Sequence, residues 1–328
     1  MKAIALISGG LDSELATRLV LQQGIEVVAV HFNTPFCLCN KKGSCKYEAL
    51  RVVEILDLPL KTIFLGEEYL EIVKKPKYGY GKNLNPCIDC RILMFRKAKQ
   101  IMNEVGASFV ITGEVLGQRP KSQNIKALKI IEKESGLEGY ILRPLSAKVL
   151  PETIPEKNGW VDRNKLLAIT GRSRKQQFKL AEIFDMKNYP CPAGGCLLTD
   201  PNFAKRMKDL LVNCDSITLR DVNLLKIGKH FRISKEYKLI IGRNEQENNK
   251  IISLKQKNDV LFEPSNVKGP VGLGVGNFSN ENLIVSSKIL ASYCKDTYIV
   301  KIKISTDSKL QTIEVEKADI EQFINYRI

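Results

Sequence analysis

The chain opens with a short apolar run that leads into a glycine-rich turn, MKAIALI followed by SGGLDS at residues 8–13. The run Ala3–Ile7 has the composition of a buried strand, and the segment Asp12–Gln23 repeats apolar residues at helical spacing. Glycines give the backbone the freedom that a tight strand-to-helix junction needs. The opening of the chain therefore predicts a β-strand, a glycine turn and an α-helix, in that order.

The residue types in this turn suit a phosphate group. The backbone amides of the glycines and of the first helical turn can donate hydrogen bonds to an anion. The two serine hydroxyls can do the same. Asp12 would repel a phosphate, so we expect it to hold a Mg²⁺ ion that bridges the phosphates. The turn lacks the GK[ST] ending of a Walker loop and the GxGxxG pattern of a Rossmann fingerprint. The alternative is a simple glycine turn with an aspartate cap.

The SGGLDS turn resembles the PP-loop of the ATP pyrophosphatase superfamily, whose members cleave ATP to AMP and pyrophosphate and adenylate a substrate oxygen. The resemblance implies that ATP and Mg²⁺ are the ligands of this turn. It also implies that the adenine lies near the end of the second strand. The residues expected to hold ATP and Mg²⁺ are Ser8, Gly9, Gly10, Asp12 and Ser13, with His31 and Phe32 near the adenine.

The first two hundred residues alternate short β-branched runs with helical patterns, which predicts an α/β fold with a doubly wound parallel sheet. The PP-loop resemblance implies the adenine-nucleotide alpha-hydrolase-like version of that fold. Ligands of such sheets bind beyond the carboxyl ends of the strands. We expect strands near Ala3–Ile7, Glu26–Phe32, Lys61–Leu65, Phe109–Thr112 and Tyr140–Arg143, and helices near Asp12–Gln23, Lys46–Leu56 and Cys90–Val105.

The character of the sequence changes near residue 214, after a helical segment around Pro201–Val212. We therefore predict a PP-loop domain over residues 1–213 and a smaller α+β or mostly β domain over residues 214–328. In the second domain we expect strands at Lys238–Ile241, Ile251–Leu254 and Thr297–Ile304, with GRNEQENN as a turn and a glycine-rich stretch at Gly269–Phe278.

The charge balance favours a polyanionic partner. Among 328 residues, 51 lysines and arginines outnumber 36 aspartates and glutamates, which gives a net charge of +15. Such an excess favours phosphate contacts, so RNA, DNA and an anionic membrane surface are all open on this ground alone. No apolar stretch approaches the roughly 18 to 20 residues of a membrane-spanning helix. We expect a cytoplasmic protein without a signal peptide or membrane anchor.

Several further segments resemble enzymes that thiolate tRNA. TGEVLGQ at 112–118, with KSQ at 121–123 and LRPL at 142–145, looks like the corresponding segments of the tRNA 4-thiouridine synthetase family. NPCIDC at 85–90 and GGCLL at 194–198 are similar to two cysteine segments of the tRNA 2-thiouridylase family. The resemblance covers about residues 1 to 210. It implies that Gly113 and Glu114 close the nucleotide site, with Gln118 and Arg143 as further contacts.

These resemblances imply an ATP-dependent tRNA sulfurtransferase. Such an enzyme adenylates a uridine carbonyl oxygen and replaces it with sulfur, with Asp12, Cys87 and Cys196 in catalytic roles. The expected partners are tRNA and a sulfur donor, either sulfide or a cysteine desulfurase, while a homodimer is one open oligomeric state. Two alternatives are a PP-loop enzyme that amidates or thiolates a small molecule, and a non-catalytic RNA-binding protein with a structural zinc site.

Nine cysteines in a reducing compartment point to metal or redox chemistry rather than disulfides. Cys87 and Cys90 form a C-x₂-C pair, to which Cys196 or Cys191 could add a third thiolate. Following the resemblance, these residues hold a [4Fe–4S] cluster with one open iron, or Cys196 carries a persulfide and is released as a disulfide with Cys87 or Cys90. A structural zinc site is the alternative.

A second cysteine group lies just after the second predicted strand. Cys37, Cys39 and Cys45 could bind Zn²⁺, with His31 as a fourth ligand, join the cluster region, or brace a loop. Cys214 and Cys294 stand alone and are more typical of small buried hydrophobic residues.

Two segments are candidates for RNA contact. Around Tyr78 and Tyr80 lie several lysines, and further basic residues follow on the next predicted helix, a mixture that suits RNA bases and phosphates. A solvated charged face is the alternative. Arg172–Lys175 is a smaller patch of this kind. The segments Lys226–Arg232 and Gly242–Glu245 resemble the RNA-binding module of the NFACT family, which implies tRNA docking by the C-terminal domain.

Overall fold

The computed structural model describes residues 1–37, 45–186, 196–295 and 298–328, and for residues 45 and 46 it describes the backbone alone. The chain divides into two compact units, Met1–Thr199 and Asp200–Ile328. The boundary at 213/214 remains a prediction. The helix that we expected at the end of the first domain, α8, is counted with the second unit.

The first unit is built on a parallel five-stranded sheet in the order β3-β2-β1-β4-β5. The strand register places Ile4 of the central strand opposite Val28 on one side and Val110 on the other. This confirms the α/β class and the five strand positions. The strands are β1 (Lys2–Leu6), β2 (Glu26–Asn33), β3 (Leu60–Phe64), β4 (Phe109–Thr112) and β5 (Ile141–Leu142).

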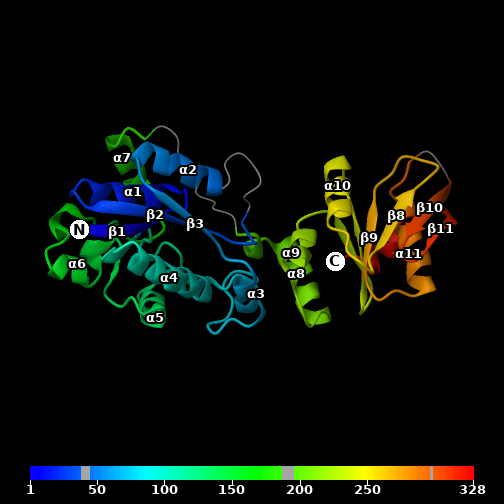
Figure 1. Cartoon of the computed structure of the whole chain (residues 1–328), viewed down its shortest axis with the longest axis horizontal. Helices are drawn as coiled ribbons and strands as arrows, with labels where there is room; N and C mark the ends of the chain where they lie inside the picture. Colours follow the sequence, from blue (N-terminus) through cyan, green and yellow to red (C-terminus); the bar gives the residue numbers. More distant parts are fainter. Residues whose placement is uncertain (38–44, 187–195, 296–297) are drawn as a thin grey trace. The chain divides into compact units, whose positions relative to one another are not determined.

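Helices cover both faces of this sheet, as parallel sheets require. In Figure 1, α1 and α7 lie on one side of the strands and α4 and α5 on the other. The helices are α1 (Leu11–Leu21), α2 (Cys45–Leu56), α3 (Glu67–Lys74), α4 (Cys87–Glu104), α5 (Ile125–Ser135), α6 (Ile154–Lys157) and α7 (Lys175–Ile183), with 3₁₀ turns η1 (Ala147–Val149), η2 (Arg163–Lys165) and η3 (Leu197–Thr199).

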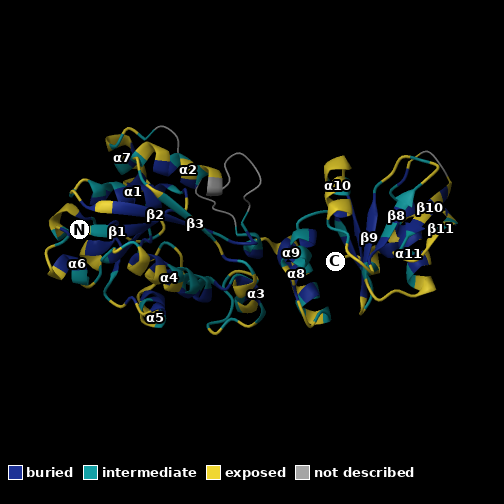
Figure 2. Ribbon diagram, viewed as in Figure 1, coloured by how far each residue is buried: buried dark blue, intermediate teal, exposed yellow. Residues whose placement is uncertain are grey.

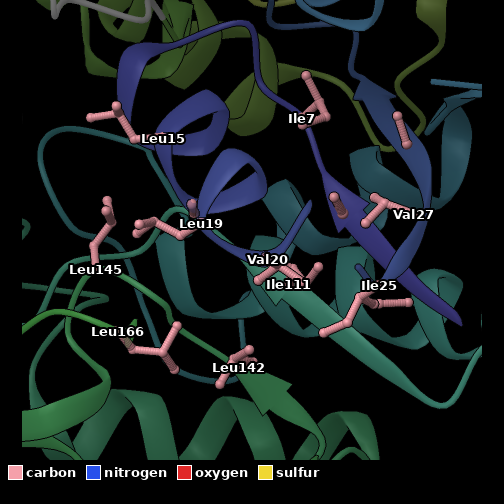
Figure 3. Packing of buried hydrophobic residues seen from close by; sticks show 14 of the residues in the cluster. Ile7, Leu15, Leu19, Val20, Ile25, Val27, Ile111, Leu142, Leu145 and Leu166 are labelled. Carbon is pink, nitrogen blue, oxygen red and sulfur yellow. The ribbon is translucent and has the colours of Figure 1, made fainter. Parts of the chain in front are cut away.

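The core of the first unit lies between the sheet and α1. Leu15, Leu19 and Val20 of that helix pack against Val27 of β2 and Ile111 of β4. Figure 3 shows this packing at close range, with side chains from the strands and the helix directed at one another. These contacts hold α1 on the sheet. The helix follows β1 directly after the glycine turn, so its first residues lie at the carboxyl end of β1.

The second unit contains a six-stranded antiparallel sheet in the order β11-β10-β8-β9-β7-β6. Its strands are β6 (Lys229–Ser234), β7 (Tyr237–Ile241), β8 (Val260–Pro264), β9 (Gly272–Gly276), β10 (Ile299–Ser305) and β11 (Leu310–Glu316). Its helices are α8 (Pro201–Asn213), α9 (Leu219–Leu225), α10 (Glu245–Ser253) and α11 (Asn280–Ala291), with a 3₁₀ turn η4 (Ile320–Tyr326). The unit is α+β. β7 is buried throughout, whereas β10 alternates buried and exposed residues and β11 is largely exposed, and Figure 2 shows this mixture of colours in the sheet.

One expected strand of this unit is wrong. Residues 251–253 belong to helix α10, which begins within the segment that we interpreted as a turn. Asn244 caps the helix by accepting a hydrogen bond from the Glu247 amide, and two glutamates in the first turn face the helix N-terminus. The cap outweighs the strand propensity of the isoleucines. None of the helices that the structure describes is long and apolar enough to cross a membrane.

Candidate active site

The SGGLDS turn connects β1 to α1 at the carboxyl end of the sheet. Gly9 has a φ of +79°, and a Cβ at this position would lie 2.6 Å from the Cβ of Glu48, so only glycine fits. Ser13 fixes the turn from its far end, because its Oγ donates to the Gly10 carbonyl at 2.8 Å and accepts from the Ser8 amide at 3.3 Å. The turn therefore has a fixed shape that ends in the amides of a helix N-terminus.

The chain beyond β4 packs directly over this turn. A Cβ on Gly113 would lie 2.4 Å from the Ser13 nitrogen and 2.5 Å from the Asp12 carbonyl carbon, which leaves room only for glycine. Strand order reverses between β1 and β4, and ligands of open parallel sheets bind at such a switch point. Gly113 thus forms one wall of the place where a nucleotide would bind.

Asp12 is held by two side chains from distant parts of the first unit. Gln118 donates from Nε2 to Asp12 Oδ2 at 2.9 Å, and a guanidinium nitrogen of Arg174 lies 3.3 Å from Asp12 Oδ1. The Arg174 guanidinium also lies over the Phe178 ring, 5.6 Å from its centroid. Gln118 Oε1 and Arg174 Nε are buried and have no hydrogen-bond partner within the described part of the chain. These unpaired atoms beside Asp12 fit a polar ligand there.

Glu114 and Arg143 form a buried ion-pair network behind this wall. Arg143 Nε donates to Glu114 at 3.1 Å, and Arg143 also bonds to Glu132 at 2.5 Å. Arg91 Nε lies 3.4 Å from the other oxygen of Glu114. The side chains of Glu114 and Arg143 are only 1% and 4% exposed and face one another. Their geometry braces the site, while the nucleotide contacts that we expect of them remain predictions.

His31 and Phe32 are both buried at the end of β2. His31 Nδ1 donates to the Ile7 carbonyl at 2.8 Å, which ties β2 to the residue just before the glycine turn. The other ring nitrogen, Nε2, is buried and has no hydrogen-bond partner within the described residues. Their placement near an adenine remains a prediction.

Three cysteine-bearing segments meet beside α4. Cys87 and Cys90 stand in the first turn of that helix, which begins at Cys87. The segment after residue 195 returns to them, because the Leu84 amide donates to the Leu198 carbonyl at 3.2 Å and the Asn83 side chain donates to the Thr199 carbonyl at 2.8 Å. Cys196 pairs with Cys37 in an isolated antiparallel β-bridge.

Tyr69 interacts with three of these cysteines. Its side chain is 1% exposed and is hydrogen-bonded to Cys90, and it lies within electrostatic range of Cys196 and Cys37. Burial, with the neighbouring thiols, raises the pKa of Tyr69 well above its usual value. Cys196 in turn interacts electrostatically with Cys90, Cys37 and Cys87. Cysteines from three distant parts of the chain thus lie within electrostatic range of one phenol, and Cys87 is within range of Cys196.

The interior position of these thiols raises their pKa values. Burial raises the pKa of Cys196 to about 12, with a further increase from Cys90. Burial also raises the pKa of Cys87, against the charges of Arg119 and Arg91, and that of Cys90, against the hydrogen bond from Tyr69. Protonated thiols are weak nucleophiles, so these cysteines need a metal, or conversion to a persulfide, to become reactive.

Arg119 is a cation within electrostatic range of both the Cys87 thiol and the glycine turn. Desolvation, followed by the charge of Arg91, lowers the pKa of Arg119, and its guanidinium interacts electrostatically with Cys87, Glu114 and Asp12. Lys121 lies on the same side, because a Cβ on Gly81 would meet both Lys121 Cγ at 3.3 Å and Cys87 Sγ at 3.4 Å. Cys87 and Asp12 therefore share one cationic neighbour at the carboxyl end of the sheet.

Some of the predicted metal ligands fall outside the described residues. These are Cys39 and Cys191, together with the side chain of Cys45. Among the residues that the structure does describe, no three histidine, cysteine or acidic side chains are grouped in a way that would hold a metal ion. Both the zinc site over Cys37, Cys39 and Cys45 and the ligand set Cys87, Cys90 and Cys196 remain predictions.

The basic and aromatic segment before α4 is largely engaged within the unit. Tyr78 and Lys77 both donate to Glu134, at 2.8 and 2.7 Å, and Arg96 contacts the same carboxylate. Asp89 accepts from the Lys77 and Tyr78 amides, which fixes the segment on the first turn of α4. Internal pairing reduces the charge that this segment offers to RNA.

A group of cations in the second unit has fewer counter-charges. Arg206, Lys229, Arg243 and Arg327 come from four separate segments and lie within electrostatic range of one another as a connected set. Desolvation and mutual repulsion lower the pKa values of Arg206 and Lys229. The Lys229 ammonium also sits over the Tyr293 ring, 3.8 Å from its centroid. Glu247 pairs with Arg243. We call Arg206, Lys229, Arg243 and Arg327 the cation cluster.

Sequence reasoning missed Tyr69 and Arg119, and it interpreted Arg174 as part of an RNA-binding patch. Arg119 lies inside the GQRPKSQ stretch that carries the thiolase resemblance, so its position in the motif was the available signal. Tyr69 lies in an ordinary amphipathic helix, which carries no such signal.

The five-stranded parallel sheet with the SGGLDS turn at its switch point defines a PP-loop domain. Residues 1–149 match the family model described as "Thiamine biosynthesis protein (ThiI)", and residues 228–327 match that of the "NFACT protein RNA binding domain". The N-terminal segment is therefore similar to PP-loop proteins, among them the tRNA thiolation enzymes.

Known relatives agree with this placement. A probable tRNA sulfurtransferase of Methanothermobacter thermautotrophicus is 32% identical over 49% of this chain and 41% of its own length. A tRNA-specific 2-thiouridylase MnmA of Caldicellulosiruptor saccharolyticus is 27% identical over 62% of this chain and 58% of its own. The chain thus spans about half the length of the curated relatives that it matches. A solved 4-thiouridine synthetase–RNA complex with bound ATP is 25% identical over 55% of this chain and 50% of its own, with a TM-score of 0.37.

Proposed function

We propose that this protein is an ATP-dependent tRNA uridine sulfurtransferase. The observation that carries the proposal is the segment Gln118–Lys121, because Gln118 donates to Asp12 of the glycine turn at 2.9 Å and Lys121 lies beside Cys87 of the thiol group. A phosphate cradle and a set of sulfur atoms at one end of one sheet suit a reaction that activates an oxygen and then replaces it with sulfur. The relatives named as tRNA sulfurtransferases support the same reaction.

In the activation step, the uridine carbonyl oxygen attacks the α-phosphate of ATP and pyrophosphate leaves. Ser8, Gly9, Gly10 and Ser13 hold the phosphates, and Asp12 holds the Mg²⁺ ion that bridges them. Gln118 and Arg174 orient the Asp12 carboxylate through the contacts described above. Adenylation is needed because a carbonyl oxygen is a poor leaving group, whereas AMP departs readily.

In the second step, sulfur displaces AMP from the activated carbon. Cys87, Cys90 and Cys196 supply the sulfur site, either as ligands of a [4Fe–4S] cluster or through a persulfide on Cys196. Cysteine thiolates are the usual ligands of such a cluster, and an open iron would carry hydrosulfide. Arg119 stabilises negative charge on Cys87 and on the departing phosphate, because its charge acts on both Cys87 and the glycine turn at Asp12.

The second unit docks the tRNA. The match to an RNA-binding family covers residues 228–327, and the cation cluster offers positive charge with an aromatic ring beside it. Cations that repel one another in the free protein are relieved when a phosphate lies between them, so the cluster favours an RNA backbone.

The decisive measurement is pyrophosphate release from ATP with and without tRNA, followed by mass spectrometry of the tRNA nucleosides after addition of sulfide and, separately, of a cysteine desulfurase with cysteine as the source of persulfide sulfur. A sulfurtransferase releases pyrophosphate only with tRNA and produces a thiolated uridine. Release that ignores tRNA, or an unmodified tRNA after full turnover, contradicts the proposal. Anaerobic purification with an iron count separates the cluster form from the persulfide form.

The docking role is tested by replacing Arg206, Lys229 and Arg243 with alanine together. We expect weaker tRNA binding and a salt dependence whose slope falls by about 1 for each phosphate that the variant no longer neutralises. ATP binding should not change. The matched control is alanine at Lys268 and Lys288, which are exposed in the same unit and lie outside the cluster. Equal tRNA affinity in the two variants contradicts the role of the cation cluster.

A further inference from the structure

Cys37 and Cys196 stand directly opposite each other across an antiparallel β-bridge. The Leu197 amide donates to the Phe36 carbonyl at 2.9 Å, so the backbone hydrogen bond flanks the cysteine pair instead of joining it. Opposed residues of this non-hydrogen-bonded kind have Cα atoms about 4.5 Å apart and neighbouring side chains. That spacing lies within the range that a disulfide spans. The pairing thus places two cysteines opposite each other from segments that are far apart in sequence.

The sulfur of Cys37 lies among hydrogen-bond donors. The Thr34 amide donates to Cys37 Sγ at 3.4 Å, and the Thr34 hydroxyl lies 3.3 Å from the same sulfur. Thr34 follows directly after β2, so a rigid strand end positions both groups. Donors aimed at sulfur stabilise the thiolate, which is the form that attacks a disulfide.

Cys87 and Cys90 are placed differently. They occupy the first turn of α4 and share no backbone pairing with Cys196. Cys90 instead receives a hydrogen bond from Tyr69, and Cys87 lies next to Arg119 and Arg91. Among the described cysteines, Cys37 is the one whose backbone register is set against Cys196.

We infer that Cys37 is the resolving thiol of the sulfur transfer, and that it forms a disulfide with Cys196 in each turnover. The inference rests on the proposed function in its persulfide form. It assigns a catalytic role to a residue that sequence reasoning placed in a zinc site, among other interpretations. From sequence, Cys87 and Cys90 were the candidate disulfide partners of Cys196, and under this inference neither of them forms that disulfide.

Atoms and electrons balance in this reaction. A donor of persulfide sulfur, such as a cysteine desulfurase carrying a cysteine persulfide, transfers its outer sulfur atom to the Cys196 thiolate and is itself left as a thiolate. The terminal sulfur of the resulting Cys196 persulfide attacks the adenylated carbon of the uridine while AMP leaves. The base is then bound to Cys196 through a sulfur–sulfur bond. The Cys37 thiolate attacks the Cys196 sulfur, so the Cys37–Cys196 bond forms and the bond to the base breaks. Its electron pair stays on the sulfur of the base, which takes up the proton that Cys37 lost. A dithiol reductant returns two electrons to the disulfide.

The first test is the disulfide itself, in the full-length protein. The reduced protein is given one equivalent of a sulfur donor with ATP and tRNA but no reductant, then alkylated, digested and analysed by mass spectrometry without reduction. A peptide pair linked through Cys37 and Cys196 is expected. A link from Cys196 to Cys87 or Cys90, or full thiolation with Cys37 still alkylated, overturns the inference. A cluster-loaded enzyme that thiolates from sulfide without oxidising Cys37 overturns it as well.

The second test uses Cys37→Ser with Cys214→Ser as the matched control. Without Cys37 the base cannot leave Cys196, so the variant should accumulate a covalent protein–tRNA species, which a non-reducing gel detects. Dithiothreitol should release thiolated tRNA from this species. The control should turn over like the original protein when a dithiol reductant is supplied. Continued turnover of Cys37→Ser with no trapped species overturns the inference.

Failure of the proposed function is distinguishable from failure of this inference. If the unaltered protein thiolates no tRNA, the proposed function fails, and the pairing is still tested by mild oxidation with diamide in the absence of substrate. Preferential formation of the Cys37–Cys196 disulfide supports the geometry. Oxidation that instead links Cys196 to a cysteine of α4 overturns it.

Discussion

Gln118 donates a hydrogen bond from its side-chain amide to the Asp12 carboxylate at 2.9 Å, across 106 residues of sequence. Gln118 belongs to the segment after β4, and Asp12 lies in the first turn of α1, the helix after β1. Because Arg174 holds the other carboxylate oxygen, Asp12 is oriented before any ligand binds. Orientation of a metal ligand by a neighbouring group is a common source of metal affinity.

Gln118→Ala should weaken Mg²⁺ binding without unfolding the protein. Loss of a hydrogen bond to a charged group costs about 1.5 to 3 kcal/mol, which corresponds to a rise of roughly tenfold or more in the Mg²⁺ concentration for half-maximal ATP binding. This Mg²⁺ concentration is measured by titrating ATP binding against Mg²⁺. Gln22→Ala, at an exposed position just after α1, is the control. Identical Mg²⁺ titrations for the two variants would show that Gln118 does not orient Asp12.

Gly113→Ala should abolish nucleotide binding. The added Cβ would lie 2.4 Å from the Ser13 nitrogen, so either β4 or the start of α1 must shift away from the phosphate cradle. Calorimetric titration with ATP measures the effect.

Gly106→Ala separates this clash from ordinary backbone strain. Gly106, unlike Gly113, has a positive φ, of +65°, and a Cβ there meets nothing within 4 Å. It should cost about 1 to 2 kcal/mol of stability through backbone strain and leave ATP affinity unchanged. If both variants bind ATP like the original protein, the wall formed by Gly113 is not part of the site.

Glu114→Ala should destabilise the first unit strongly. The carboxylate is 1% exposed and pairs with Arg143, itself 4% exposed, so its loss leaves a buried cation with less compensation. Breaking a buried pair from one side costs about 3 to 5 kcal/mol. Urea unfolding followed by amide exchange in β4 measures the loss.

The matched control is Glu71→Ala, whose carboxylate pairs with Lys74 but is 71% exposed. An exposed pair of this kind contributes about 1 kcal/mol or less. Similar losses in the two variants would mean that burial of the Glu114 network has little effect on its strength.

The start of the fold follows from local sequence. The apolar run, the glycine turn and the amphipathic helix are adjacent in the chain, so periodicity and turn chemistry suffice to place β1 and α1. The same holds for the strands that carry Phe109 and Glu26, whose positions the structure confirms. Cys87 and Cys90 were recognised because their spacing is a motif in itself.

The neighbours of the thiols could not be found in this way. Cys37 and Tyr69 follow β2 and β3, and they meet Cys196 only because residues 196–199 fold back across the sheet end. Nothing in the local sequence encodes that return. The Ile251–Leu254 strand failed for a related reason, because a side-chain cap at Asn244 decided the structure against the propensity of the residues that follow.

The stability of the second unit should fall as pH drops below about 6.5, the ordinary pKa of histidine. His230 is buried, and desolvation together with the charges of Lys238 and Arg206 lowers its pKa well below that value. The unfolded chain therefore binds a proton that the folded chain does not, so stability rises with pH across this window and is lost on acidification. The limiting slope for one such group is about 1.4 kcal/mol per pH unit.

His230→Gln separates the contribution of His230 protonation to stability from the contribution of carboxylates, which also titrate in acid. The His230 Nε2 group donates to the Ile227 carbonyl at 2.9 Å, and a glutamine amide keeps a donor for that carbonyl while removing the titration. Urea unfolding at several pH values between about 7 and 5, with exchange of the β6 and β7 amides as the probe, gives the two stability curves. They should diverge as the pH falls, with the glutamine variant losing less. Parallel curves would mean that His230 takes up its proton without cost in the folded unit.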